Sequence, residues 1–412
     1  MNQPFNLRRG EPLGRYGENW DDRAWLFRSP PASGPDVAGA EVVFGPALGF
    51  NNYIDVNAGV DFVRELHRGG YQNPVVVIKH GKACGAATGE HAVERAYQGD
   101  PMNAFGGIWG FARRFELADA QDLCDRPNGI EDKIGWRRDV IFAPDFSGEA
   151  IDHIRGHEGK KVNTRLVTIP GLLDQESAYE MRPIRGGHLV QRRDPSLYFT
   201  EDGKIDGLFV PAYDRPTGKM VDTPQGKKPE TRRVGVVTKA SPPRSLTRVA
   251  DFAVRLCFQE PSNATVIARE YATDGFQLVG YGIAEPGRSD SCWEATERSR
   301  RFYERENRIV QGTASAADQA ILANEVGEMQ RNRLQIYRDL CVWGAAATDS
   351  FFPFPDGLRE LAKSRVTLVL HPGGSIRDQE VIAAADDLKM EMIYTGKRYF
   401  KHGDKAPVEV TE

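Results

Sequence analysis

The stretch Asn73–Gly89 reads NPVVVIKHGKACGAATG and decides the first fold element. Its β-branched run VVVIK (75–79) is typical of a buried strand. The run ends in the adjacent pair Lys79 and His80, and the small residues that follow predict a loop, which leaves room for a ligand to approach the backbone. Such a pair more often decorates a surface, so it marks a candidate site only if other motifs support it.

Short strand-like runs alternate with helix-like segments along the chain. The further strand-like runs are VIFAP (140–144), RLVTIP (165–170), TVIARE (265–270), QLVGYG (277–282) and RVTLVL (365–370). Apolar residues recur every three or four positions in residues 53–69, 89–100 and 317–340, which predicts helices. This alternation favours an α/β layered fold.

Two lobes are expected, residues 1–190 and 191–412, because 412 residues suffice for at least two cores. The Gly-, Pro- and charge-rich region 201–245 is interpreted as a long connection. VVVIKHGKACG and VTLVLHPGGS share one weak pattern of strand, His, Gly-containing turn and helix, which suggests a repeated design.

Composition excludes several functional classes. The net charge is −4 and the isoelectric point about 6.1, so no basic field is available to bind nucleic acid. The sequence contains neither an apolar run long enough for a membrane helix nor a hydrophobic signal core, which predicts a soluble cytoplasmic protein. The five cysteines form no C-x-x-C pair, which argues against disulfides and structural zinc.

Two more segments carry unusual residues near predicted strand ends. SNATVIA and GRSDS place Ser262, Asn263 and Arg288 at the ends of a predicted hairpin. TDSFFPFPDG is followed by LHPGGSIRDQEVI and GKRYFKHG. In open α/β sheets, ligands bind at the carboxyl ends of strands. Each segment also has a structural interpretation, as a simple turn or an aromatic-packed bend.

Ten motifs taken together resemble one family. In order they are GRYGENWDDRAWLF, GFNNYIDVNAG, VVIKHGKACGAATG, DPMNAFGGI, DVIFAPDF, RPIRGGHLVQRRD, PSNATVIA, TDSFFPFPDG, HPGGSIRDQEVIAAADDL and YTGKRYFKHG. From about Gly14 to His402 the chain is similar to the formyltransferase half of the bifunctional purine-synthesis protein, which acts on 5-aminoimidazole-4-carboxamide ribonucleotide (AICAR). Because the sequence starts just before RYGEN, a transformylase without the cyclohydrolase half is expected.

The resemblance implies a fold and a reaction. The fold is two cytidine-deaminase-like α/β/α lobes in an intertwined homodimer, with active sites at the subunit interface. The reaction transfers the formyl group of 10-formyltetrahydrofolate to the 5-amino group of AICAR, so the expected partners are a nucleotide and a folate. The zinc signature of deaminases, H-x-E with P-C-x-x-C, does not occur in the sequence.

The resemblance also implies catalytic roles. The aromatic amine of AICAR is a weak nucleophile, so its proton must leave as it attacks, and a neutral imidazole suits that task. The oxyanion that forms needs a cation and an amide donor. The family pattern assigns these roles to His80 as general base, Lys79 as oxyanion partner and Asn263 as a further donor.

Other site residues are transferred one by one from the family's motifs. The resemblance implies nucleotide contacts by Arg15, Tyr16, Phe105, Gly106, Asp139, Arg288, Phe351, Arg398 and His402. It places Met102 and Asp356 at the pterin end of the folate site, and Asp349 among the ligands of the potassium ion that some members bind.

Three departures from the family leave alternatives open. Lys82-Ala83-Cys84-Gly85 lacks the usual proline, Glu285-Pro286-Gly287 replaces polar positions, and His371 stands where Gln is common. The last two changes raise the alternative of a related aminoazole carboxamide nucleotide as acceptor. A catalytically silent nucleotide- or folate-binding homologue is a second alternative, against which Lys79, His80 and Asn263 weigh.

Overall fold

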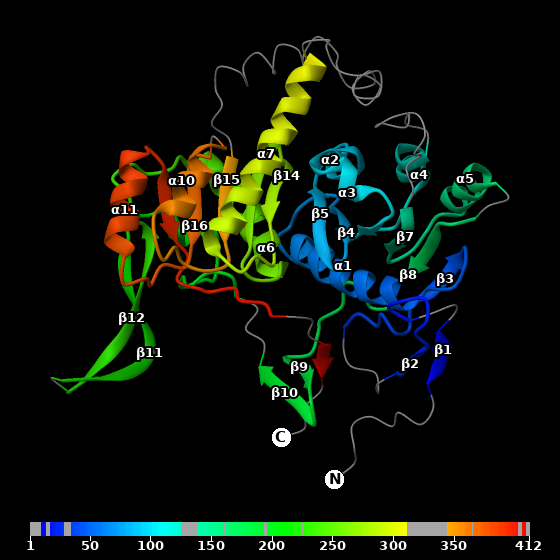
Figure 1. Cartoon of the computed structure of the whole chain (residues 1–412), viewed down its shortest axis with the longest axis horizontal. Helices are drawn as coiled ribbons and strands as arrows, with labels where there is room; N and C mark the ends of the chain where they lie inside the picture. Colours follow the sequence, from blue (N-terminus) through cyan, green and yellow to red (C-terminus); the bar gives the residue numbers. More distant parts are fainter. Residues whose placement is uncertain are drawn as a thin grey trace. The chain divides into compact units, whose positions relative to one another are not determined.

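The structure is a computed structural model. It describes residues 10–13, 17–28, 34–124, 138–159, 162–192, 196–224, 226–310, 344–364, 366–402 and 406–408, without the side chains of 307–310 and 406–408. The chain divides into two compact units, and the main division falls between residues 194 and 195 (Figure 1). Each unit combines a mixed sheet with helices, so the predicted α/β class is confirmed. The predicted helix 317–340 lies outside the described residues.

The main sheet of unit 1 has the strand order β5-β4-β6-β7-β8-β3. It is parallel across β6, β7 and β8 and antiparallel elsewhere. Two small sheets also belong to this unit, β1-β2 and β10-β9-β18. The strand bounds are β1 Glu11–Leu13, β2 Ala24–Leu26, β3 Glu41–Phe44, β4 Val75–Lys79, β5 Lys82–Ala87, β6 Gly107–Phe111, β7 Arg138–Ala143, β8 Arg165–Thr168, β9 Tyr179–Ile184, β10 Gly187–Arg192 and β18 Ala406–Val408.

Helices cover both faces of this sheet, which explains why Val75–Ile78 of β4 is apolar throughout. On one face a Cβ at Gly59 of α1 would lie 2.7 Å from the Phe142 ring, and on the other a Cβ at Gly85 would lie 2.1 Å from the Ala96 carbonyl oxygen of α2. Both glycines therefore allow a helix to pack closely. The helices are α1 Phe50–Arg68, α2 Ala92–Gly99, α3 Pro101–Ala104, α4 Leu117–Cys124 and α5 Gly148–Glu158.

Unit 2 contains a sheet of strand order β11-β12-β17-β16-β15-β13-β14, parallel across β15, β16 and β17. Its α7, α10 and α11 share one apolar core with alternate residues of the strands, among them Ile267, Val369 and Met392, whereas α6 packs on β13, β15 and β16. The elements are η1 Ile205–Leu208, β11 Tyr213–Thr223, β12 Gly226–Val236, η2 Arg244–Leu246, α6 Thr247–Gln259, β13 Thr265–Ala272, β14 Gly275–Gly282, α7 Arg288–Val310, β15 Gly344–Thr348, α10 Asp356–Ala362, β16 Leu368–His371, α11 Asp378–Asp387 and β17 Glu391–Tyr394.

The two units repeat one strand-pairing pattern. In each, a hairpin (β4-β5 or β13-β14) pairs antiparallel with a strand that begins a parallel set of three, and an antiparallel strand (β3 or β12) closes the set. The pattern matches β4 with β13 and β7 with β16. The suggested correspondence of VVVIKHGKACG with VTLVLHPGGS, which lie on β4 and β16, is therefore wrong.

Two sequence interpretations are corrected. The region 201–245 is not a simple connection, because it contains the long hairpin β11-β12, which projects from unit 2 in Figure 1. Its side chains are mostly exposed, so it lacks the apolar signal of a buried strand. The small residues after His80 form β5 and not a loop.

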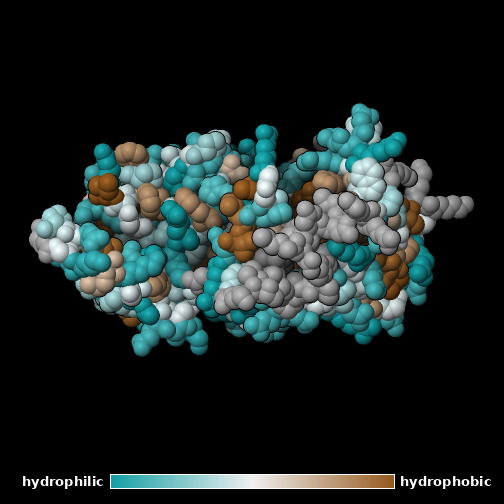
Figure 2. Space-filling view, turned by 90° about the horizontal axis from the view of Figure 1, so that it is seen from below, coloured by the Kyte–Doolittle hydropathy of each residue, from teal (hydrophilic) through white to brown (hydrophobic). Residues whose placement is uncertain are grey.

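The surface in Figure 2 is mainly hydrophilic, with small separate apolar patches. Among the helices that the structure describes, none has the length and apolar character required to cross a bilayer.

Candidate functional site

In unit 1 the predicted residues gather at one edge of the sheet. Lys79 ends β4, and its Nζ donates a hydrogen bond to the Phe105 carbonyl oxygen at 2.7 Å. Gly106 has φ +65°, and a Cβ there would lie 3.2 Å from Lys79 Nζ and 4.0 Å from Asp139 Oδ1. A side chain at position 106 would therefore fill the space between an ammonium and a carboxylate. The structure brings Lys79, Phe105, Gly106 and Asp139 together.

His80 is exposed at the turn between β4 and β5, with φ +52°. Asp55 of α1 reaches the same turn, where its Oδ1 accepts a hydrogen bond from the Gly81 amide at 2.6 Å. Asp55 lies within the motif GFNNYIDVNAG but was not predicted as a site residue, because nothing in the sequence places α1 beside this turn. Met102, on α3, is exposed.

In unit 2 both polar atoms of the Asn263 side chain form hydrogen bonds. Its Nδ2 donates to the carbonyl oxygens of Glu285 and Pro286, at 2.9 and 3.0 Å. Its Oδ1 accepts from Arg288 Nη2 at 2.8 Å. The predicted hairpin is confirmed, because Thr265 pairs with Gly282 and so brings both segments to one end of β13-β14.

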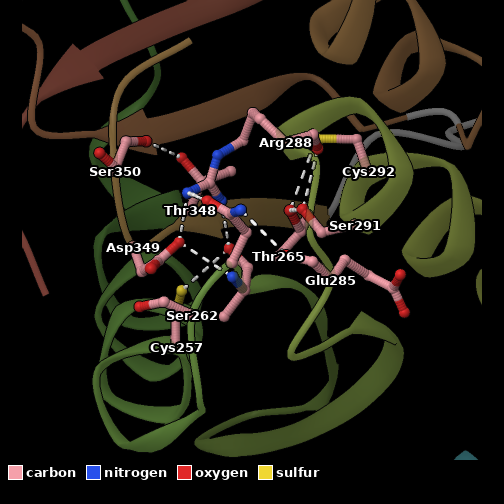
Figure 3. Close-up of polar contacts among 12 residues, drawn as sticks. Cys257, Ser262, Thr265, Glu285, Arg288, Ser291, Cys292, Thr348, Asp349 and Ser350 are labelled. Carbon is pink, nitrogen blue, oxygen red and sulfur yellow. Dashed lines mark hydrogen bonds and ion pairs between the residues drawn. The ribbon is translucent and has the colours of Figure 1, made fainter. Parts of the chain in front are cut away.

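Arg288 connects Asn263 to Asp349, and Figure 3 shows the guanidinium beside the Asp349 carboxylate. Its guanidinium donates to the Ala264 carbonyl oxygen at 2.7 Å and lies 2.5 Å from Asp349 Oδ1. Both side chains are buried, with Arg288 7% and Asp349 0% exposed. In the described part of the chain, Arg288 Nε and Asp349 Oδ2 have no hydrogen-bond partner. The Arg288 guanidinium therefore serves to hold Asn263 and to neutralise a buried carboxylate.

The segment after β17 completes this edge of unit 2. Ser262 and Lys401 exchange two hydrogen bonds of 3.0 Å, and the Tyr399 amide donates to the Asp349 carbonyl oxygen. On its exposed side, Arg398 stacks on Phe400, with Cζ 4.4 Å from the ring centroid, and His402 contacts the same ring edge-on. Phe400 was not predicted, although the alternation R-x-F-x-H could have indicated three side chains on one face.

The remaining predicted residues take separate positions. Phe351 is half-buried, two residues after Asp349. Asp356 begins α10, and its Oδ2 accepts a hydrogen bond from Ser289 Oγ at 2.7 Å. Arg15 and Tyr16 lie outside the described residues. No group of three or more His, Cys, Asp or Glu side chains that could hold a metal occurs in the ranges that the structure describes.

His371, the last residue of β16, is fully buried. Its Nδ1 accepts a hydrogen bond from the Gly373 amide at 3.2 Å, and its ring packs edge-on against Phe352 and Tyr394. Burial, and secondly the charge of Arg288, lower the pKa of His371 to about 3. The imidazole is therefore neutral at physiological pH and supports the turn after β16.

In the two units, the predicted site residues lie at opposite edges of equivalent sheets. In unit 2, Asp349 and His371 follow or end the parallel strands at their carboxyl ends, as expected for an open sheet. In unit 1, Gly106 and Asp139 lie where β6 and β7 begin, which is the amino edge. The predicted site residues therefore lie at the carboxyl edge of the parallel strands in unit 2 and at their amino edge in unit 1.

The fold is that of a mixed α/β protein of two repeated units, and sequence comparison shows the family to which it belongs. Residues 3–298 match the model of the AICARFT/IMPCHase bienzyme family. The chain therefore belongs to that family. It is 30% identical over 401 residues to the bifunctional purine biosynthesis protein PurH of Rhodopirellula baltica, covering 96% of this chain and 60% of that protein. PurH of Persephonella marina is 31% identical over 392 residues, covering 94% and 59%. The chain spans about 60% of the length of these relatives.

Proposed function

We propose that this chain is a folate-dependent formyltransferase that transfers the formyl group of 10-formyltetrahydrofolate to the 5-amino group of AICAR. Family membership supports the reaction class. The observation that carries the proposal is the grouping of Lys79 Nζ, Gly106 and Asp139 at the strand end that also bears His80. A cation and an exposed imidazole on neighbouring residues are two of the groups that formyl transfer requires.

His80 accepts a proton from the amine as its nitrogen forms a bond to the formyl carbon. The Lys79 ammonium stabilises the negative charge that develops on the formyl oxygen, and this stabilisation is larger in the transition state than in the ground state. When the bond from the formyl carbon to the folate nitrogen breaks, the leaving nitrogen takes up a proton. Gly106 leaves the space beside Lys79 open for the nucleotide.

Asn263 contributes as a preorganised amide. Both hydrogens of its Nδ2 point to carbonyl oxygens, and Arg288 fixes its Oδ1. A contact between Nδ2 and the oxyanion therefore replaces one of these carbonyl acceptors. We assign Arg288 to the orientation of Asn263, and Arg398 and His402, exposed around Phe400, to the nucleotide.

Potassium is the further ligand that the family implies, and one atom of the structure fits it. Asp349 Oδ2 is a buried carboxylate oxygen without a hydrogen-bond partner in the described chain. Carboxylate and carbonyl oxygens are ligands for hard cations, so Asp349 would be the charged ligand there. A thermal unfolding midpoint that rises more in KCl than in tetramethylammonium chloride supports this assignment, and equal midpoints contradict it.

The proposal also includes the cytidine-deaminase-like form of the lobes, a homodimer with active sites at the subunit interface, and a cytoplasmic location. Sedimentation of the purified chain tests the dimer. His371 no longer supports a related aminoazole carboxamide nucleotide as the acceptor, because its imidazole is buried and hydrogen-bonded within unit 2.

The deciding experiment mixes the purified protein with 10-formyltetrahydrofolate and AICAR and records the absorbance of tetrahydrofolate. We expect turnover with AICAR and less with its pyrazole counterpart. His80→Ala and Lys79→Ala should each lower kcat by on the order of 10², with little change in nucleotide affinity. His157→Ala, an exposed histidine on α5, is the matched control and should be unchanged. Absence of turnover in the wild type would favour a silent binding protein.

A further inference from the structure

The turn that carries His80 is strained. Only His80 and Gly81 lie between β4 and β5, and both have positive φ, +52° and +72°. This is the geometry of a type I′ hairpin turn, which favours Gly or Asn at both central positions. A residue with a Cβ is uncommon there, although histidine is among the non-glycine residues that adopt positive φ more often. Residues in such sparsely populated conformations concentrate at functional positions that the surrounding structure holds in place. Some contact must therefore hold this turn.

Asp55 provides that contact from a rigid element. It projects from α1, whose residues from Val56 onward are largely buried against the sheet. Its Oδ1 accepts a hydrogen bond from the Gly81 amide at 2.6 Å, and the backbone of His80 also acts to lower the pKa of the same carboxyl. The Asp55 carboxylate thus bonds the second central residue of the turn directly. Hydrogen bonds to a charged acceptor are stronger than neutral ones.

The carboxylate is also an electrostatic partner of the same turn. Burial raises the pKa of Asp55, and the turn amides together with the charges of His80 and Lys79 act in the opposite direction. Lys82, which pairs with Lys79 across the turn, is the other cation on these two strands near it. The Asp55 carboxylate therefore lies within electrostatic reach of the residue that would take the proton. A base that becomes a cation during catalysis benefits from such a neighbour.

We propose that Asp55 is the positioning residue of the general base: it holds the His80–Gly81 turn in its left-handed conformation and stabilises the imidazolium that forms when His80 takes the proton. The inference deepens the proposed function and rests on it, because it takes His80 as the proton acceptor. It predicts that Asp55 affects the chemical step and not nucleotide binding.

The kinetic test uses two substitutions and a control. Asp55→Ala removes the acceptor and the charge, and we expect kcat to fall about 30-fold or more. Asp55→Asn keeps an oxygen that can accept from Gly81 and removes the charge, so we expect a loss of about 10-fold. The KM for AICAR should change less than about 3-fold in both. Asp152→Asn, an exposed helical aspartate of α5 in the same unit, should match the wild type. Losses confined to KM, or both Asp55 variants within 2-fold of the wild type, would overturn the proposal.

A second readout does not depend on activity. The Gly81 amide proton, measured by NMR in the full chain, should lie downfield in the wild type, remain partly shifted in Asp55→Asn and move upfield in Asp55→Ala. An unchanged Gly81 signal in Asp55→Ala overturns the positioning role even if the protein has no formyltransferase activity. Conversely, a shifted signal with full activity in His80→Ala supports the positioning role and rejects the catalytic function.

Discussion

The buried ion pair between Arg288 and Asp349 allows the strongest stability prediction. Asp349→Asn keeps the shape of the side chain but leaves the Arg288 guanidinium, 7% exposed, without its counter-charge. Removing one member of a buried pair costs about 3–5 kcal/mol, because the other charge stays desolvated. For a protein part of this size, about 2–4 °C per kcal/mol corresponds to a fall of roughly 6–20 °C in the unfolding midpoint.

Urea unfolding followed by circular dichroism measures this effect. Arg288→Met combined with Asp349→Asn removes both charges, so the double variant should lose less than the sum of the single losses, with a coupling of about 2 kcal/mol or more. Arg300→Met is the control on the same helix, because Arg300 pairs with the exposed Glu304, and it should cost less than about 1 kcal/mol. If Asp349→Asn stays within 1 kcal/mol of the wild type, or the single losses add, the pair does not stabilise unit 2 as argued.

Two further predictions concern His371 and Phe400. The unfolded chain takes up a proton on His371 near pH 6.5, whereas the folded chain does so only near pH 3, so this group lowers stability as the pH falls through that window. Between pH 7 and pH 5 the wild type should therefore lose about 2 kcal/mol more unfolding free energy than His371→Gln. If the difference in unfolding free energy between the two proteins did not change with pH, the assigned burial of His371 would be contradicted. Phe400→Leu removes the aromatic ring that stacks on Arg398, an interaction worth about 0.5–1 kcal/mol at an exposed site. The KM for AICAR should therefore rise about 2- to 5-fold at unchanged kcat. An unchanged KM would show that this stacking does not orient Arg398.

The buried strands were predictable where packing acts on both faces. Helices cover β4 and β13 on each side, so both strands carry runs of buried, mostly β-branched residues. These runs are visible in the sequence. β5 was missed because its sequence KACGAA has no β-branched residue. Its Gly85 is required where the α2 backbone approaches, and that requirement arises only after the helix packs. The hairpin β11-β12 was missed because its exposed strands carry charge and proline.

The site was predictable in its residues but not in its contacts. Lys79 and Asn263 stand at strand ends in recognisable motifs, so their candidacy follows from the sequence. The hydrogen bond from Gly81 to Asp55 spans 26 residues, and the contact of Arg288 with Asn263 spans 25. Such contacts depend on which helix face meets which turn, a tertiary result that local periodicity does not encode.

The left-handed conformation of His80 has a consequence for engineering. Glycine adopts that conformation freely, whereas other residues with a Cβ lose about 1–2 kcal/mol there. A library selected only for thermal stability would therefore replace His80 with glycine and score the change as an improvement, although the proposed catalytic group would be gone. Stabilisation of this protein by design should keep the β4–β5 turn unchanged and introduce stabilising substitutions elsewhere, for example at solvent-facing residues of α5 and α7.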